Sequence, residues 1–122
     1  MTKERLDFEI SFFEDVVKDR PGYFEALAAL GNAYTKKGRY TDGLEIDMKL
    51  LRIKPDDPVV HYNLACSYSL LGDADRSLEA LKKSVRFGYK DFDYMERDPD
   101  LDFVRKDPRY PEEIIKNKKI IS

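Results

Sequence analysis

The sequence repeats itself with a period of 34 residues. Aligning the chain with itself at this offset superposes seven identical residues within one period: Leu30 on Leu64, Tyr34 on Tyr68, Gly38 on Gly72, Leu44 on Leu78, Glu45 on Glu79, Lys49 on Lys83 and Arg52 on Arg86. About two identities would be expected from average composition. A fixed period of this size is typical of stacked helical units, each of which cannot bury its apolar face alone.

Within each period the apolar residues have helical spacing. The pattern i, i+3, i+4, i+7 is occupied in the first period by Leu27, Leu30, Gly31 and Tyr34, and in the second by His61, Leu64, Ala65 and Tyr68. Both runs end near a glycine that can adopt the left-handed conformation that closes a helix, Gly38 or Gly72. Second helices are predicted at roughly 41–53 and 75–87. Each unit is therefore predicted to be two antiparallel helices joined by a tight turn.

This pattern resembles the tetratricopeptide repeat, a 34-residue motif written W-x2-L-G-x2-Y…A-x3-F…P. The first unit shows it as Leu27-x2-Leu30-Gly31-x2-Tyr34, followed by Gly43 and Pro55. The second shows it as His61-x2-Leu64-Ala65-x2-Tyr68, then Ser77-x3-Leu81, with Tyr89 in the proline position. The resemblance implies an all-α fold, a right-handed superhelical stack of antiparallel helix pairs (a TPR-like alpha-alpha solenoid).

The motif also implies how the helices of each pair meet. Small residues stand where adjacent helices must approach closely, at Gly31, Gly43, Ala65 and Ser77. Asp47 replaces the large aromatic residue expected against the neighbouring helix. We expect Ile46 or Met48 to fill that space and Asp47 to be partly exposed.

We predict a single domain over residues 1–122. Its parts are an N-terminal half-repeat helix at 3–20, a first repeat at 24–57, a second repeat at 58–90, and a degenerate repeat with a C-terminal cap at 91–117. The cap is predicted because four apolar side chains near two Asp-Pro helix starts can cover the last helix pair: Leu101, Val104, Tyr110 and Ile114. The tail from Lys116 to Ser122 is predicted to be a frayed, solvated end.

The helix at 3–20 resembles the second helix of a repeat whose first helix is missing. Its inward face is predicted to hold Leu6, Ile10, Phe13, Val16 and Val17. Phe8 and Phe12 fall on its outer side. They either curl onto the first complete unit or form a surface for self-association, since exposed apolar area commonly marks an interface.

Composition excludes several classes of function. The 22 basic and 24 acidic residues leave a net charge of −2, which removes the broad basic field that nucleic-acid binding needs. One cysteine excludes an internal disulfide framework, and one histidine argues against a metal site. The chain has no apolar stretch of membrane-spanning length, and its charged start carries no apolar run of a secretory signal. We therefore predict a cytoplasmic protein without nucleic-acid or membrane partners.

No converging set of reactive groups suggests catalysis. His61 occupies the position of a large core residue, and no general base can be nominated beside Cys66. Glycine-rich phosphate loops are absent. An enzyme would require Asp47, His61 and Cys66 to gather in one pocket, which their helical spacing opposes. We predict a protein that is not an enzyme and needs neither a cofactor nor a metal.

The resemblance instead implies a peptide-binding groove, because the first helix of each pair lines the concave side of such a stack. The residues predicted to line it are Asn32, Thr35 and Lys36 in the first unit and Tyr62, Asn63, Cys66 and Ser69 in the second. Amide side chains can pair with a peptide backbone. The predicted function is a protein–protein interaction adaptor that binds a peptide or partner protein. The alternative is a homodimer formed through the incomplete N-terminal repeat.

Some relatives in this family grip the C-terminal carboxylate of a partner with two asparagines and several basic residues. Asn32 and Asn63 match the asparagine positions, and Arg97 matches one basic position. Ala28 and Asp93 stand where lysines are required. The sequence therefore does not predict binding of a partner's C-terminal carboxylate.

Overall fold

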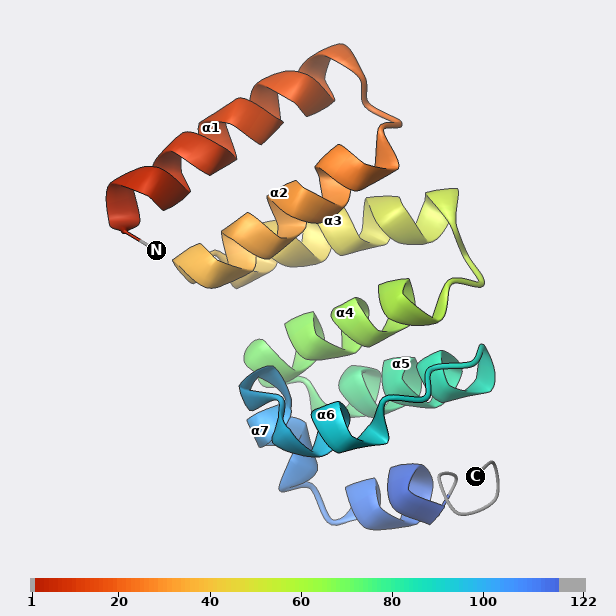
Figure 1. Cartoon of the computed structure of the whole chain (residues 1–122). Coiled ribbons are helices and arrows are strands. Elements are labelled where there is room, and N and C mark those ends of the chain that lie inside the picture. The colour runs from red at the N-terminus through yellow and green to blue at the C-terminus, as the bar shows by residue number, and fades with distance from the viewer. Residues whose placement is uncertain (1, 117–122) are drawn as a thin grey trace. The chain divides into compact units, whose positions relative to one another are not determined.

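The computed structural model describes residues 2–116, and none of these residues lies in a strand. The elements are α1 (Lys3–Asp19), α2 (Phe24–Lys37), α3 (Tyr40–Ile53), α4 (Pro58–Leu70), α5 (Ala74–Arg86), α6 (Phe92–Arg97), η1 (Pro99–Leu101), α7 (Asp102–Arg105) and η2 (Pro111–Ile115) (Figure 1). The predicted all-α class is confirmed. The chain divides into two compact units, residues 1–55 and 56–122, and most of the predicted tail lies outside the described residues.

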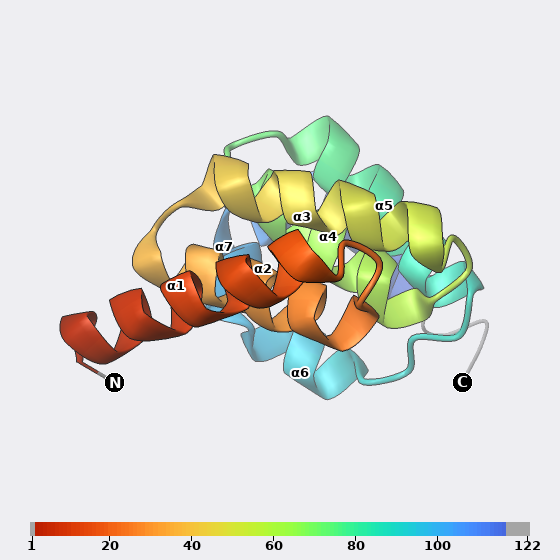
Figure 2. The same ribbon diagram turned by 90° about the horizontal axis from the view of Figure 1, so that it is seen from above.

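In the first unit α1 packs on α2, and α2 packs on α3 (Figure 2). The core consists of buried aliphatic side chains from all three helices, among them Leu6, Ile10, Leu27, Leu30, Ile46 and Leu50. Glycine lets α2 and α3 approach closely. A Cβ atom on Gly43 would lie 2.9 Å from Thr35 Oγ1, and one on Gly31 would lie 3.1 Å from Ile46 Cγ2. Gly31 and Gly43 therefore allow the close approach of α2 and α3 that the sequence predicts for them.

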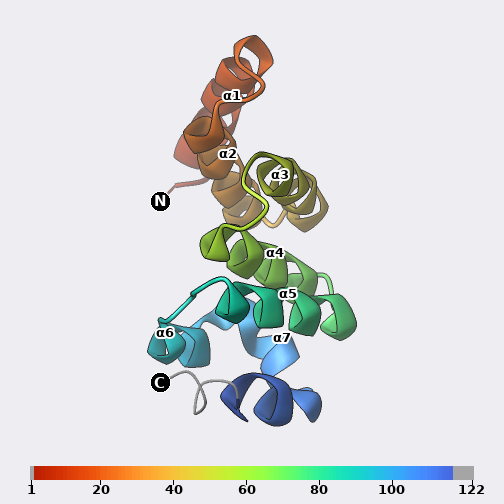
Figure 3. The ribbon, with the colours of Figure 1, turned by 90° about the vertical axis from the view of Figure 1, so that its right-hand side faces the viewer.

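In the second unit α4 and α5 form the equivalent antiparallel pair. The Ser77 hydroxyl donates to the carbonyl oxygen of Ala65 (2.8 Å), one period after the Gly43–Gly31 approach. The C-terminal helices lie on one side of this pair (Figure 3), where η1 and α7 contact α4 and η2 contacts α5. All four predicted covering residues are buried: Leu101, Val104, Tyr110 and Ile114. These side chains belong to the segment that contacts α4 and α5, and the division of residues 91–117 into a degenerate repeat and a cap stays a prediction.

The turns within the two pairs repeat each other at the level of single hydrogen bonds. Gly38 and Gly72 have φ angles of +85° and +78°, which glycine adopts at little energetic cost. The N–H of Arg39 donates to the carbonyl of Tyr34 (2.8 Å), and the N–H of Asp73 donates to that of Tyr68 (2.9 Å). These groups are 34 residues apart in each case. The periodicity of the sequence is therefore a periodicity of backbone structure.

Two expectations for the first unit are corrected. Asp47 is only 6% exposed, because it lies on the face of α3 that packs against α2 near Gly31. Ile46 fills the space beside it, whereas Met48 is exposed. Phe8 and Phe12 do not curl onto the unit and are 71% and 46% exposed. Of the predicted inward face of α1, Leu6 and Ile10 are buried, while Phe13, Val16 and Val17 are half-buried.

Candidate peptide-binding surface

The predicted site residues of the first unit lie along α2. Asn32 and Lys36 are exposed, so an amide and an ammonium group face solvent. Thr35 is half-buried, and its hydroxyl donates to the carbonyl oxygen of Gly31 (3.1 Å). Ala28 is half-buried one turn before Asn32. We call Ala28, Asn32, Thr35 and Lys36 the α2 stripe; it offers hydrogen-bonding groups and one positive charge beside a small apolar residue.

The predicted site residues of the second unit lie along α4, and most of them are covered. Tyr62, Cys66 and Ser69 are 5%, 8% and 1% exposed, whereas Asn63 is half-buried. This burial differs from the open stripe expected from the sequence. The physical reason is that residues 89–104 of the same chain occupy the space above these side chains.

The contacts between α4 and residues 89–104 are polar as well as apolar. The Tyr62 hydroxyl donates to Asp98 Oδ2 (2.6 Å), and the Cys66 thiol lies 3.8 Å from the same oxygen. Ser69 Oγ accepts from the N–H of Val104 (3.3 Å). The Tyr62 ring stacks on Tyr89 with a centroid distance of 4.3 Å and an interplanar angle of 4°. α4 therefore binds a largely helical segment of the same chain, made of α6, η1 and the start of α7, through a phenol, a hydroxyl and an aromatic face.

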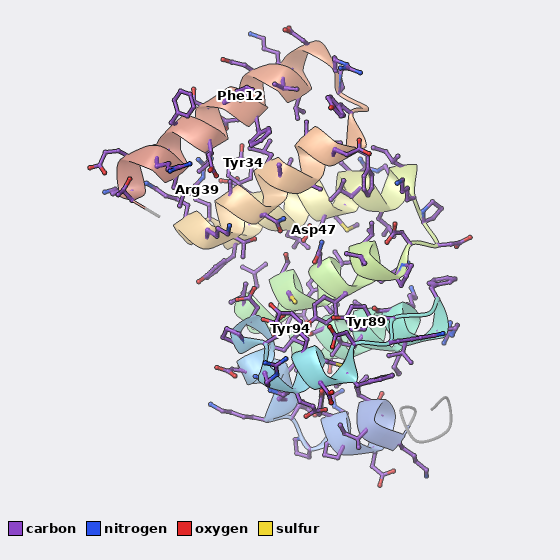
Figure 4. The ribbon with its side chains drawn as sticks, in the orientation of Figure 1. Phe12, Tyr34, Arg39, Asp47, Tyr89 and Tyr94 are labelled. Atoms are coloured by element: carbon purple, nitrogen blue, oxygen red, sulfur yellow. The ribbon has the colours of Figure 1, made fainter. Side chains whose placement is uncertain are left out.

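The phenols around Asp98 keep their protons at ordinary pH. Burial and the hydrogen bond to Asp98 raise the pKa of Tyr62, and burial raises the pKa of Tyr89. The negative charge of Asp98 raises the pKa of Tyr94, which lies on α6 (Figure 4). A protonated Tyr62 can donate to the carboxylate of Asp98, which also accepts from the N–H of Asp100 (3.0 Å). A phenol and a backbone N–H thus stabilise the buried carboxylate through hydrogen bonds.

The 34-residue register relates the covered stripe to the open one. Ala28 corresponds to Tyr62, Asn32 to Cys66, and Thr35 to Ser69. The buried thiol of Cys66 on α4 thus corresponds to the exposed amide of Asn32 on α2. The two stripes occupy equivalent places in their pairs but differ in what covers them.

A hollow of about 360 Å³ lies in the first unit, and sequence reasoning did not find it. Its apolar lining residues are Val17, Pro21, Leu30 and Ile46, and its other lining residues are Glu14, Lys18, Tyr34, Asp42, Glu45 and Lys49. The sequence contains one signal for this hollow. Residues 3–20 and the second helix of the first repeat are one period apart in the sequence, and a single helix lies between them.

Tyr34 joins α1 to α2 beside this hollow (Figure 4). Its hydroxyl donates to Glu14 Oε2 (2.5 Å), and the guanidinium carbon of Arg39 lies 4.4 Å from its ring centroid. Burial, together with the hydrogen bond to Glu14, raises the pKa of Tyr34 to about 12. The phenol is therefore a proton donor that ties the half-repeat to the first complete pair.

The remaining candidate residues have structural contacts. His61 is buried and stacks on Phe87 with a centroid distance of 5.1 Å, which confirms the predicted core position. Arg97 Nε donates to the carbonyl oxygen of Asp93 within α6 (3.2 Å). Within residues 2–116, no three His, Cys, Asp or Glu side chains form a group that could hold a metal ion, and no helix is both long and apolar enough to cross a membrane.

Comparison with known sequences agrees with the helix pairs. Residues 24–57 and 59–87 match the sequence model of the tetratricopeptide repeat. This chain belongs to the tetratricopeptide repeat family. Repeats of this family generally mediate protein–protein interactions and act as non-enzymatic scaffolds.

A curated relative shares part of the chain. A chloroplastic protein of Arabidopsis thaliana is 38% identical over 79 residues, which are 62% of this chain and 24% of the relative. The chain therefore matches about a quarter of the length of this relative. The relative's name places that protein in the chloroplast, and the cytoplasmic location expected for this chain stays a prediction.

Proposed function

We propose that this tetratricopeptide repeat protein is a non-enzymatic adaptor that binds a peptide segment of a partner protein on the α2 stripe. The observation that carries the proposal is the coverage of the equivalent stripe on α4 by residues 89–104. On α4 this place in a helix pair holds another segment of the chain, which contains α6, η1 and the start of α7. The same place on α2 keeps Asn32 and Lys36 exposed to solvent.

The chemistry of the α2 stripe suits a peptide. The Asn32 amide can donate to a backbone carbonyl and accept from a backbone N–H at the same time. Ala28 stands where α4 carries Tyr62, so a larger apolar side chain of the partner has room above it. Lys36 adds a positive charge next to these groups. The expected partner segment carries an apolar residue and a nearby carboxylate.

The predicted site residues on α4 have a different role in this proposal. Tyr62, Cys66 and Ser69 hold the chain's own segment, so they contact a partner only when residues 89–104 leave. Asn63 is half-buried and remains partly accessible beside them. The proposal therefore assigns first contact with the partner to Asn32, Thr35 and Lys36.

The proposal is tested by cross-linking from two faces of the first unit. A photoreactive amino acid is placed at position 32 on the α2 stripe or at position 45 on the rim of the hollow, and the protein is irradiated in extract of the native cell. We expect a discrete partner from position 32. Mass spectrometry then identifies the cross-linked segment of that partner.

The identified segment is next titrated by calorimetry against the wild type, Asn32→Ala and the control Glu45→Ala. Loss of one hydrogen-bonding side chain at an interface removes about 1 kcal/mol, which is about a five-fold loss of affinity. We expect this loss for Asn32→Ala and unchanged binding for Glu45→Ala. Cross-links from position 45 alone, or equal affinities of all three proteins, would show that the α2 stripe is not the binding surface.

A further inference from the structure

The outward face of α1 carries aromatic side chains that the folded unit leaves uncovered. Phe8 and Phe12 are 71% and 46% exposed, and their rings stack on each other with a centroid distance of 6.4 Å and an interplanar angle of 10°. Phe12 also makes an edge contact with Phe13 at 5.2 Å. Adjacent exposed aromatic residues mark interaction surfaces on soluble proteins.

The repeat register shows that the folding of a helix pair does not explain this face. Phe12 corresponds to Ile46 and Ala80, which are 5% and 4% exposed in the two complete repeats. In those repeats a partner helix covers this position. At position 12, α1 carries an apolar residue, as the second helices of the complete pairs do at the equivalent positions. Within residues 2–116, however, no other segment buries the Phe12 side chain.

Phe8 departs from the register in another way. Its counterparts one and two periods later are charged, Asp42 and Arg76. A charged side chain is sufficient at this position for a helix pair to fold. The fold of a helix pair therefore does not require an aromatic residue at position 8.

The exposed face of α1 is complementary to itself when it is turned by 180°. Arg5, Phe8, Phe12 and Asp15 lie on one stripe of the helix, at spacings of three, four and three residues, opposite the buried Leu6 and Ile10. The stripe is symmetric about position 10, since positions 5 and 15 are equally distant from it and so are positions 8 and 12. In an antiparallel pair of α1 helices, Phe8 would meet Phe12 of the second copy, and Arg5 would meet Asp15 of the second copy.

The charges on α1 are arranged consistently with this pairing. On the side toward α2, Asp7 makes an ion pair with Lys37 and Glu14 accepts from Tyr34, so these carboxylates are used within the unit. Arg5 and Asp15 are exposed, and no ion pair within residues 2–116 involves either of them. The two charges at the ends of the aromatic stripe thus remain available to a second copy.

We propose that two copies of this chain associate through the outward faces of their α1 helices, antiparallel about a two-fold axis near position 10. An isologous contact of this kind is the commonest way in which identical chains pair. A 17-residue helix is about 25 Å long, so its face is smaller than a standard interface of about 800 Å² per partner. The dissociation constant is expected to be on the order of 10–100 μM.

Sedimentation equilibrium of the full chain between about 5 and 500 μM tests this pairing. The wild type should pass from monomer to dimer over this range, and Phe8→Ser/Phe12→Ser should remain monomeric with an unchanged helical circular dichroism spectrum. Arg5→Asp and Asp15→Arg should each weaken association about ten-fold, because each places like charges opposite each other. The double variant Arg5→Asp/Asp15→Arg should recover the wild-type dissociation constant, because opposite charges again face each other and only their positions are swapped.

The outcomes separate this pairing from other occupants of the face. A wild type that stays monomeric at about 500 μM would overturn the proposal and leave the face to a different protein. A dimer that survives Phe8→Ser/Phe12→Ser would place the contact elsewhere on the chain and overturn it as well. A double charge variant that is no tighter than the single variants would refute the antiparallel register on which the proposal rests. None of these results bears on the α2 stripe, whose test uses other residues.

Discussion

The hydrogen bond between Tyr62 and Asp98 is expected to hold residues 89–104 on α4. Tyr62→Phe removes the hydroxyl that donates to Asp98 Oδ2 at 2.6 Å and keeps the ring that stacks on Tyr89. Asp98 is 4% exposed, so its carboxylate loses a donor that water cannot replace without an opening of the segment. A hydrogen bond to a charged group contributes about 1.5–3 kcal/mol. The free energy of opening should therefore fall by about 2 kcal/mol.

Cys66 provides a direct assay, because it is the one cysteine of the chain and is covered by the same segment. A thiol reagent can label Cys66 only when residues 89–104 move away. Under conditions where opening is fast and reversible, the labelling rate follows the opening equilibrium. A loss of about 2 kcal/mol corresponds to about a 30-fold increase in rate. Labelling is measured with excess reagent in native buffer.

Tyr34→Phe is the matched control, because it removes an equivalent hydroxyl that donates to Glu14 in the other unit. We expect the labelling rate of Cys66 in this variant to stay within about two-fold of the wild type. A Tyr62→Phe rate less than about three-fold above the wild type, or equal to that of Tyr34→Phe, would refute the reasoning. The segment would then be held by apolar packing and not by the buried phenol–carboxylate pair.

Three further predictions concern stability, measured by urea unfolding. Gly43→Ala should destabilise the protein by about 1–3 kcal/mol, because its Cβ would lie 2.9 Å from Thr35 Oγ1; the control Gly22→Ala, with nothing within 4 Å, should stay within about 0.5 kcal/mol. Asp57→Ala should lower the free energy of unfolding by about 1 kcal/mol, because α4 loses its N-cap. Asp57→Asn should keep most of the wild-type stability, because asparagine also caps helices well. The pKa of Tyr34 is about 12 in the folded chain against 10.0 for an ordinary tyrosine, so its contribution is complete below pH 10 and is lost between pH 10 and 12. Tyr34→Phe should therefore make stability fall less steeply with pH in this range, and an unchanged slope would contradict the assigned pKa.

The helix pairs could be predicted closely from the sequence. The second helices expected at roughly 41–53 and 75–87 are observed at Tyr40–Ile53 and Ala74–Arg86. This accuracy has a local cause. Glycine at the left-handed position ends the first helix of each pair, and the 3.6-residue period of apolar side chains defines the helices between these turns. Such signals depend on residues a few positions apart and need no knowledge of the rest of the chain.

The candidate site was predicted less completely, and Asp47 and Tyr62 show why. The repeat pattern has an aromatic residue at position 47, so it does not tell how an aspartate is accommodated between α3 and α2. The burial of Tyr62 depends on Asp98, 36 residues away in a segment that no longer follows the repeat. Periodicity identifies equivalent positions, but it does not tell which of them the chain itself covers.

The sequence by itself determined the all-α class, the two helix pairs and the turns between them, because local backbone preferences and apolar spacing decide these features. The tertiary structure alone decided that the stripe on α4 is occupied by residues 89–104, that the α2 stripe is open, and that the aromatic face of α1 is uncovered. The physical reason is that burial is a property of contacts between segments distant in sequence. The residues next to a side chain along its helix do not reveal whether another segment of the chain covers that side chain and buries it from solvent.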